Sequence, residues 1–257
     1  MGKVRVIEIH ENVFKDNNTA ADRVREKLIK KGTCMINVMS SPGSGKTTLL
    51  TALINNLKDK LNIAVMDVDI ETSLDAERVA GKTGVRALQI HNGGLCHIDA
   101  EMTEKALTEF ESEFNGKAFA EAESDCTGKT CAEPERDFKG NDAYPDLIFL
   151  ENIGNLVCPA EFDTGAHKKM MLFSVPEGDD KPLKYPLMFS ICDLIVISKT
   201  DTADFFDFDF DKALKNIRGL NKNARVIRVS AKTGEGIEEL SEYILETVKE
   251  IKNDGKR

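Results

Sequence analysis

Short apolar runs alternate with amphipathic stretches along most of this chain of 257 residues. Apolar runs of about four to eight residues are typical of buried strands, and apolar positions three or four residues apart are typical of helices. Runs of the first kind lie at residues 34–39, 63–69, 85–90, 145–154, 169–175, 193–198 and 224–229. Helices are expected at residues 20–31, 49–54, 99–110 and 237–251. The alternation predicts a doubly wound α/β fold with a mostly parallel sheet and a binding site at the C-terminal ends of the strands.

Two segments depart from this alternation. We expect residues 1–32 to form an N-terminal arm that packs on the main domain or on a partner, with residues 33–257 as that domain. The polar stretch at about 111–142 lacks apolar periodicity, which predicts a surface loop or a disordered insertion. Cys126 and Cys131 inside it suit a metal clip, a redox pair or no function at all.

A glycine-rich segment at residues 40–48 follows the first main strand and precedes a helix. Strand, glycine-rich turn and helix together are typical of a loop that binds the phosphates of a nucleotide. Glycines let the backbone aim its N–H groups at phosphate oxygens, and the following helix adds the positive end of its dipole. Ser40 stands where the first glycine is usual. The residues expected to bind nucleotide here are Gly43, Ser44, Gly45, Lys46, Thr47 and Thr48.

Catalysis and magnesium binding would use residues from this loop and from the ends of two strands. Lys46 is expected to reach the β- and γ-phosphates, and the Thr47 hydroxyl to bind Mg²⁺. Carboxylates at strand ends beside the loop suit Mg²⁺ or its waters, so Asp69 is the preferred candidate and Asp67 the alternative. Glu151 ends a buried strand and is expected to contact Mg²⁺ through water.

Residues 71–78 come soon after the strand that carries Asp69. Thr72 suits an N-cap with Asp75 at the N3 position, which predicts an ordinary helix start. The same segment also suits a switch that senses the γ-phosphate. The sequence leaves both interpretations open.

Two later loops favour GTP over ATP. Lys199 and Asp201 follow a strand in a pattern similar to the guanine-reading loop of GTPases, where the aspartate accepts from guanine N1–H and the 2-amino group. Ser198 replaces the usual Asn, so we expect weaker bracing of that loop. A second strand leads to residues similar to the loop whose backbone N–H contacts guanine O6. These residues are Ser230, Ala231 and Lys232.

The composition of the chain limits the kinds of partner that it can bind and the cell compartment in which we expect it. The net charge is −9 and no basic stretch is extended, which argues against nucleic acid binding. No apolar run approaches the ~20 residues needed to cross a membrane, and the N-terminus lacks a secretory pattern, so we expect a cytoplasmic protein. Six cysteines in such a chain favour free thiols or metal ligands over disulfides.

Three side chains suit a soft or borderline metal ion. Cys96 and His97 follow a glycine-rich turn, and thiolate with imidazole suits Zn²⁺, Ni²⁺ or copper, although the pair also fits an ordinary helix start. Cys158 lies seven residues after Glu151 and would therefore lie on a nucleotide-sensitive segment. Cys34 and Cys192 have apolar neighbours and are expected in the core.

Together these motifs resemble the hydrogenase-maturation nickel-insertion GTPases, the HypB family. The resemblance extends from about residue 33 to the C-terminus, apart from 111–142, and its most specific pieces are residues 41–47, 92–100, 151–163 and 177–186. It implies a SIMIBI-like phosphate-loop GTPase with slow intrinsic turnover. It also implies that Cys96, His97 and Cys158 form a Ni²⁺ or Zn²⁺ site that can lie at a homodimer interface.

By the same resemblance, the chain would use GTP and Mg²⁺ to assist nickel insertion into a [NiFe]-hydrogenase precursor. Its expected partners are a second copy, formed with GTP, an accessory metallochaperone (HypA-like) and the hydrogenase large-subunit precursor. Two alternatives are a nickel GTPase for urease maturation and a metal carrier that uses GTP only as a structural ligand. A chaperone for a cobalamin-dependent mutase shares the phosphate loop, but the Cys-His pair and the segment after Glu151 argue against it.

Overall fold

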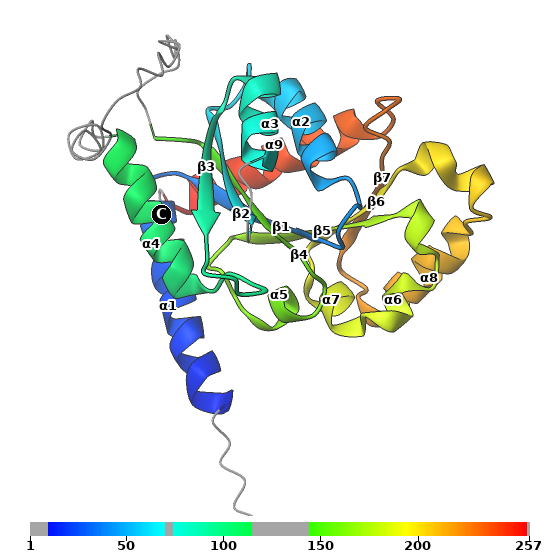
Figure 1. The fold of residues 1–257 in the computed structure, drawn as a ribbon, viewed down its shortest axis with the longest axis horizontal. Coiled ribbons are helices and arrows are strands. Elements are labelled where there is room, and N and C mark those ends of the chain that lie inside the picture. The colour runs from blue at the N-terminus through cyan, green and yellow to red at the C-terminus, as the bar shows by residue number, and fades with distance from the viewer. Residues whose placement is uncertain (1–9, 70–73, 115–143, 256–257) are drawn as a thin grey trace, which may run out of the picture.

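A computed structural model of the protein describes residues 10–69, 74–114 and 144–255. Within these ranges the strands form a seven-stranded sheet in the order β3-β2-β4-β1-β5-β6-β7, and every paired strand is parallel (Figure 1). The strands are β1 (Cys34–Ser40), β2 (Ile63–Asp69), β3 (Arg86–His91), β4 (Leu147–Gly154), β5 (Lys168–Ser174), β6 (Leu194–Ser198) and β7 (Arg225–Arg228). The sequence therefore predicted the fold class and the order of strands along the chain.

Helices connect the strands, as parallel pairing requires. They are α1 (His10–Lys30), α2 (Lys46–Leu57), α3 (Leu74–Thr83), α4 (Ala100–Phe114), α5 (Cys158–Glu161), α6 (Lys181–Lys184), α7 (Pro186–Ile191), α8 (Phe210–Leu220) and α9 (Ile237–Asp254). Two 3₁₀ segments, η2 (Val175–Glu177) and η3 (Thr200–Phe205), lie among them. Within the residues that the structure describes, no helix combines the length and apolar composition that crossing a lipid bilayer requires.

The core has two sides because successive residues of a strand point to opposite faces of the sheet. Cys34, Ile36 and Val38 of β1 pack with apolar residues of α2, α3 and α9 on one face. On the other face, Met35 packs with residues of α1 and α4, and Met39 packs with residues of α7 and α8. Figure 1 shows α1 and α4 side by side and away from α2 and α3. The sheet therefore separates the α1–α4 pair from the α2–α3 pair.

The end of α4 differs from the sequence expectation. The helix predicted at 99–110 extends to Phe114, so the first residues of the polar stretch predicted at about 111–142 are helical. Its last turn is held because Glu111 accepts from Lys27 (3.0 Å) and Lys31 (2.7 Å) of α1. The rest of that stretch, with its two cysteines, lies outside the described residues. Residues 4–9, whose apolar positions suggest a short strand, also lie outside them.

Helix α1 fits closely against the segment that leads into β5. Gly165 has a φ of +79°, and a Cβ atom there would lie 2.5 Å from Val24 Cβ. Arg25 of α1 forms an ion pair with Asp163 and donates to the carbonyl of Ala166 at 3.2 Å. The approach of α1 thus depends on a residue without a side chain at position 165.

We predict that Gly165→Ala lowers the free energy of unfolding by about 2–4 kcal/mol, because left-handed strain and a clash with Val24 add together. Gly32→Ala is the matched control, since Gly32 has a φ of +68° but no atom within 4 Å of its added Cβ. It should cost only the strain, about 1–2 kcal/mol. Urea unfolding of both variants measures the difference. Equal losses would show that α1 moves aside without cost.

Candidate functional site

The phosphate-binding loop lies at the C-terminal end of β1 and leads into α2. Gly43 and Gly45 both adopt left-handed φ angles, +73° and +96°, which a residue with a side chain rarely adopts. Helix α2 begins at Lys46, so the N–H groups of its first turn point toward the loop without partners inside the helix. This geometry suits an anion held by backbone N–H groups.

Ser40 takes part in the loop through its side chain. The Lys46 ammonium donates to Ser40 Oγ at 3.0 Å, and that hydroxyl donates to the carbonyl oxygen of Ser41 at 2.7 Å. A glycine at position 40 could not make either bond. The departure from the usual sequence thus gives Lys46 a partner within the loop.

A buried carboxyl pair lies beside the loop. Glu151 of β4 and Asp67 of β2 are register partners on adjacent strands, and both are almost fully buried. Thr47 Oγ1 donates to Glu151 Oε1 at 3.2 Å, while Glu151 Oε2 has no hydrogen-bond partner in the structure. Burial and, after it, the negative charge of Asp67 raise the pKa of Glu151 to about 8, which Lys46 opposes.

These oxygens fit a magnesium ion. Mg²⁺ prefers hard oxygen ligands, and a cation would relieve both the burial of Glu151 and its repulsion by Asp67. Asp67, the alternative at the sequence level, is the acid whose position beside Glu151 is described. Asp69 is the last residue of β2, where it pairs with His91, and its side chain lies outside the described atoms. Its role stays a prediction.

Two hydrogen bonds connect the expected guanine loop to the phosphate loop. Ser198 Oγ donates to the carbonyl of Ser44 at 2.8 Å, and the Lys199 ammonium donates to the carbonyl of Gly43 at 2.7 Å. Lys199 itself adopts a left-handed conformation, with a φ of +59°. Ser198, although shorter than the usual Asn, thus still reaches the phosphate loop, and the weaker bracing expected from this replacement stays a prediction.

Asp201 is held by the second guanine loop. Ser230 Oγ donates to Asp201 Oδ1 at 2.7 Å, and the Lys232 ammonium lies 3.9 Å from Asp201 Oδ2. The backbone N–H of Thr200 donates to the carbonyl of Val229, which fixes the two loops together. Ala231 follows Ser230 in the same turn. The structure thus brings Asp201 and residues 230–232 together, as the sequence suggested.

A cavity of about 530 Å³ opens above the phosphate loop. Its lining includes Asp75, Arg78 and Lys82 of α3. Sequence reasoning left residues 71–78 open as a switch that senses the γ-phosphate, but it assigned none of these three side chains to the site individually. The signal for them was the spacing of three and four residues along a helix that starts near the end of β2. That spacing gives a common face but does not say which way the face points.

The candidate metal-binding residues meet at the surface. Cys96 Sγ and Cys158 Sγ are 2.9 Å apart, and Cys96 Sγ is 3.9 Å from His97 Nδ1. The His97 ring stacks on Phe162 with 3.9 Å between ring centres. The Asn155 side-chain amide donates to the Cys96 carbonyl at 3.3 Å, which connects the two loops that carry the thiols. Residues far apart in the sequence thus form one cluster.

This cluster is not yet a closed metal site. Two thiolates that share a tetrahedral ion lie about 3.7 Å apart, as follows from a metal–sulfur distance of about 2.3 Å. The two sulfurs would therefore separate slightly to bind an ion. Burial lowers the pKa of His97, which favours the neutral imidazole that binds metals. In the part of the chain that the structure describes, no three His, Cys, Asp or Glu side chains already surround a common point closely enough for an ion.

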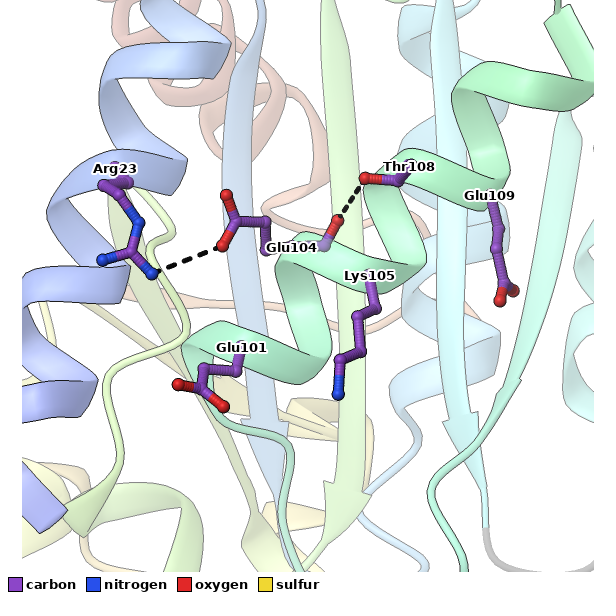
Figure 2. A pocket seen from close by; sticks show the side chains of 6 residues that line it. All are labelled: Arg23, Glu101, Glu104, Lys105, Thr108 and Glu109. Atoms are coloured by element: carbon purple, nitrogen blue, oxygen red, sulfur yellow. Dashed lines mark hydrogen bonds and ion pairs between the residues drawn. The ribbon is translucent and has the colours of Figure 1, made fainter.

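A second groove, of about 480 Å³, lies between α1 and α4. Figure 2 shows its lining, in which Arg23 points toward Glu104 and forms an exposed ion pair of 3.5 Å. The other lining residues are Glu101, Lys105, Thr108 and Glu109. Since exposed charges of both signs make up this lining, the groove offers no pattern for catalysis.

The raised pKa of Glu151 predicts a pH dependence of stability in the absence of divalent cations. The unfolded carboxyl titrates near 4.5 and the folded one near 8, so stability should fall as pH rises from about 4.5 to about 8. Glu151→Gln should remove this fall, which is of the order of a few kcal/mol. Urea unfolding in EDTA at several pH values measures it. Glu239→Gln, the same change at an exposed site, should leave the slope unchanged, and an unchanged slope in Glu151→Gln would contradict the prediction.

Comparison with known proteins places these features in a family. Residues 34–228 match the family described as "CobW/HypB/UreG, nucleotide-binding domain". The hydrogenase maturation factor HypB of Rhizobium leguminosarum bv. viciae is 38% identical over 241 residues, which cover 93% of this chain and 69% of that protein. The probable hydrogenase maturation factor HypB of Methanocaldococcus jannaschii is 36% identical over 252 residues, covering 98% of this chain and 100% of that protein.

Solved structures agree with the sequence comparison. The crystal structure of HypB from Helicobacter pylori in complex with nickel has a TM-score of 0.76 and 34% identity, covering 91% of this chain and 96% of that one. The fold, the phosphate loop and the sequence relatives all indicate the same family. The chain belongs to the HypB family of hydrogenase maturation factors.

Proposed function

We propose that this chain is a GTP-hydrolysing metallochaperone that assists nickel insertion into a [NiFe]-hydrogenase precursor. The observation that carries the proposal is the position of Cys158 and Cys96 beside the end of β4, the strand that brings Glu151 to the phosphate loop. Family membership supports the nucleotide and hydrogenase parts. The nickel part is supported by the thiol pair with its neighbouring imidazole, and by the relative from Helicobacter pylori that was crystallised with nickel.

Individual residues can be assigned to the proposed binding and hydrolysis of GTP. The loop N–H groups and Lys46 would bind the phosphates, and Asp201 would read guanine while Ser230 holds it. Thr47 and Glu151, with Asp69 or Asp67, would hold Mg²⁺, which supplies charge neutralisation on the phosphates when bound. Hydrolysis would rest on positioning and charge stabilisation, with slow intrinsic turnover.

The two halves are connected through the end of β4. A Cβ on Gly154 would lie 3.1 Å from the backbone nitrogen of Pro42, so this glycine packs directly on the phosphate loop. The next residue, Asn155, donates to the Cys96 carbonyl and accepts from the Val157 N–H at 2.9 Å. A shift of Gly154 with nucleotide state would thus change the distance between the thiols, and linkage requires nickel to act back on GTP binding equally.

Protein contacts are expected around the thiols. Leu95 and Val157, neighbours of Cys96 and Cys158, are exposed by 43% and 55%. Apolar side chains beside candidate metal ligands suit a surface that a second copy or a client protein covers. We propose a GTP-dependent homodimer in the cytoplasm that exchanges nickel with an accessory, HypA-like metallochaperone and the hydrogenase large-subunit precursor.

Isothermal titration with Ni²⁺ in the presence of GDP, and then of a non-hydrolysable GTP analogue, tests the coupling. We expect the nickel affinity to differ at least about threefold between the two states. Cys96→Ala should abolish tight binding, and Cys158→Ala should abolish the difference. Cys192→Ala removes a buried thiol elsewhere in the core and should change neither.

Equal nickel affinity in both nucleotide states would contradict the coupling. A metal carrier that uses GTP only as a structural ligand would release no phosphate under multiple-turnover conditions. Capture of urease apoprotein in place of hydrogenase precursor would favour the urease alternative.

The bond from Ser198 to the phosphate loop predicts an effect on nucleotide affinity. Ser198→Ala should weaken GDP binding about three- to tenfold, since one hydrogen bond contributes about 1 kcal/mol. Ser198→Asn should restore it. Ser190→Ala is the matched control, because the Ser190 hydroxyl also donates to a carbonyl, that of Leu187, at 2.7 Å. Fluorescent GDP titration measures each variant, and an unchanged affinity in Ser198→Ala would show that the bond does not brace the loop.

A further inference from the structure

The nucleotide cavity has a cationic wall that the phosphate loop does not supply. Arg78 and Lys82 of α3 line it opposite residues 43–48. Arg78 Nη1 donates to Asp75 Oδ1 at 3.0 Å, and Asp75 lines the same cavity. The ion pair between Arg78 and Asp75 therefore lies at the cavity that the phosphates of a nucleotide would occupy.

The position of this pair is fixed by the core. Ala76, Val79 and Thr83 of α3 are buried, and Val79 packs with apolar residues of α2 and the sheet. Residues 75, 78 and 82 lie on the side of the helix that lines the cavity. Because α3 is anchored against α2, which begins at the phosphate loop, Arg78 does not depend on a flexible segment for its position.

The Asp75 carboxylate also acts electrostatically on the buried carboxyl group of Glu151. The negative charge of Asp75 contributes to the raised pKa of Glu151, so the Asp75 carboxylate lies within electrostatic reach of that buried group. Lys46 and Thr47, the residues that reach the β- and γ-phosphates and Mg²⁺ in loops of this type, line the same cavity. The end of the phosphate chain would therefore lie in the cavity that α3 helps to line.

The energetics favour an exchange of partners. The side chains of Arg78 and Asp75 are 62% and 36% exposed, and ion pairs of that kind contribute little to stability. A guanidinium matches the geometry of a phosphate and can bind it through two parallel hydrogen bonds, which are stronger inside a cavity than at the surface. A phosphate group at this wall would thus compete successfully with Asp75 for Arg78.

We propose that Arg78 is a catalytic residue that exchanges Asp75 for the γ-phosphate when GTP binds. The proposal rests on the proposed GTPase function. During hydrolysis a water oxygen bonds to the γ-phosphorus, the bond from that phosphorus to the bridging oxygen breaks, and GDP and hydrogen phosphate form while one proton of the water passes to solvent. Arg78 donates hydrogen bonds to the γ-phosphate oxygens throughout and transfers no proton. The exchange also connects α3 to the nucleotide state, because only a triphosphate offers this contact.

Fluorescent titrations of Arg78→Ala with GDP and with a non-hydrolysable GTP analogue test the contact directly. We expect the affinity for the analogue to fall at least about tenfold and that for GDP less than about twofold. Single-turnover hydrolysis should slow at least about tenfold, since an arginine on the transferring phosphoryl group stabilises its transition state. Arg78→Lys keeps the charge without the paired hydrogen bonds and should recover part of the binding but less of the rate.

Arg23→Ala is the matched control. Arg23 is also an exposed arginine in an ion pair with a carboxylate, and it lies with α1 and α4, away from α3 (Figures 1 and 2). It should leave both affinities and the rate unchanged. An equal loss of GDP and analogue binding in Arg78→Ala would overturn the γ-phosphate contact, and so would no loss at all. Failure of the proposed function is distinguishable, because the unaltered protein would then not hydrolyse GTP, whether or not it binds GTP.

Discussion

The contact between the end of β4 and the phosphate loop is the constraint on which both sites depend. Ser40 of β1 and Gly154 of β4 are register partners, so the two strands reach the same edge of the sheet together. A Cβ at position 154 would lie 3.1 Å from the backbone nitrogen of Pro42, which is tighter than an ordinary contact, so glycine lets β4 pass this close without displacing the loop. The positions of the residues that follow Gly154, including Asn155 and Cys158, depend on this close contact with Pro42. A chain with a looser end of β4 would have a phosphate loop and a thiol pair but no physical connection between them.

The two buried carboxyl groups inside the sheet lower the free energy of unfolding, and the same groups are suited to bind a cation. Glu151 and Asp67 lie on adjacent strands with almost no exposure, and repulsion between buried acids costs free energy. A core that extends over both faces of seven strands can tolerate such a cost, because the apolar area it buries is large. A cation is the group that would remove it. The burial and mutual repulsion of these carboxyl groups lower the local stability of the fold. The same two effects would favour binding of a cation.

Local patterns in the sequence account for the parts of the structure that are local. The apolar runs predict the strands, and the glycines before Lys46 predict the loop, because each of these features depends on neighbouring residues. The proximity of Cys96 and Cys158 was predicted from family resemblance, since the two thiols lie 62 residues apart and no spacing rule brings them together.

The end of α4 was misplaced because its stabilising partners, Lys27 and Lys31, belong to α1. Arg78 belongs to the segment left open as a γ-phosphate switch, but its side chain was not assigned to the site because the direction in which α3 faces is decided by packing. The hydrogen bond from Ser198 to the phosphate loop was not foreseen, because its partner, the Ser44 carbonyl, lies 154 residues away.

The hydrogen bond between Ser40 and Lys46 has a consequence for the turnover of the loop. In a loop with glycine at position 40, no side chain at that position could accept from the Lys46 ammonium. Here the Ser40 hydroxyl remains as a partner of that ammonium, and a hydrogen bond to a charged group contributes about 1.5–3 kcal/mol. A diphosphate bound at this loop would therefore leave against a smaller loss of free energy than it would from a loop with glycine at this position. One hydroxyl group in place of a hydrogen atom would thus favour exchange of the nucleotide over its retention.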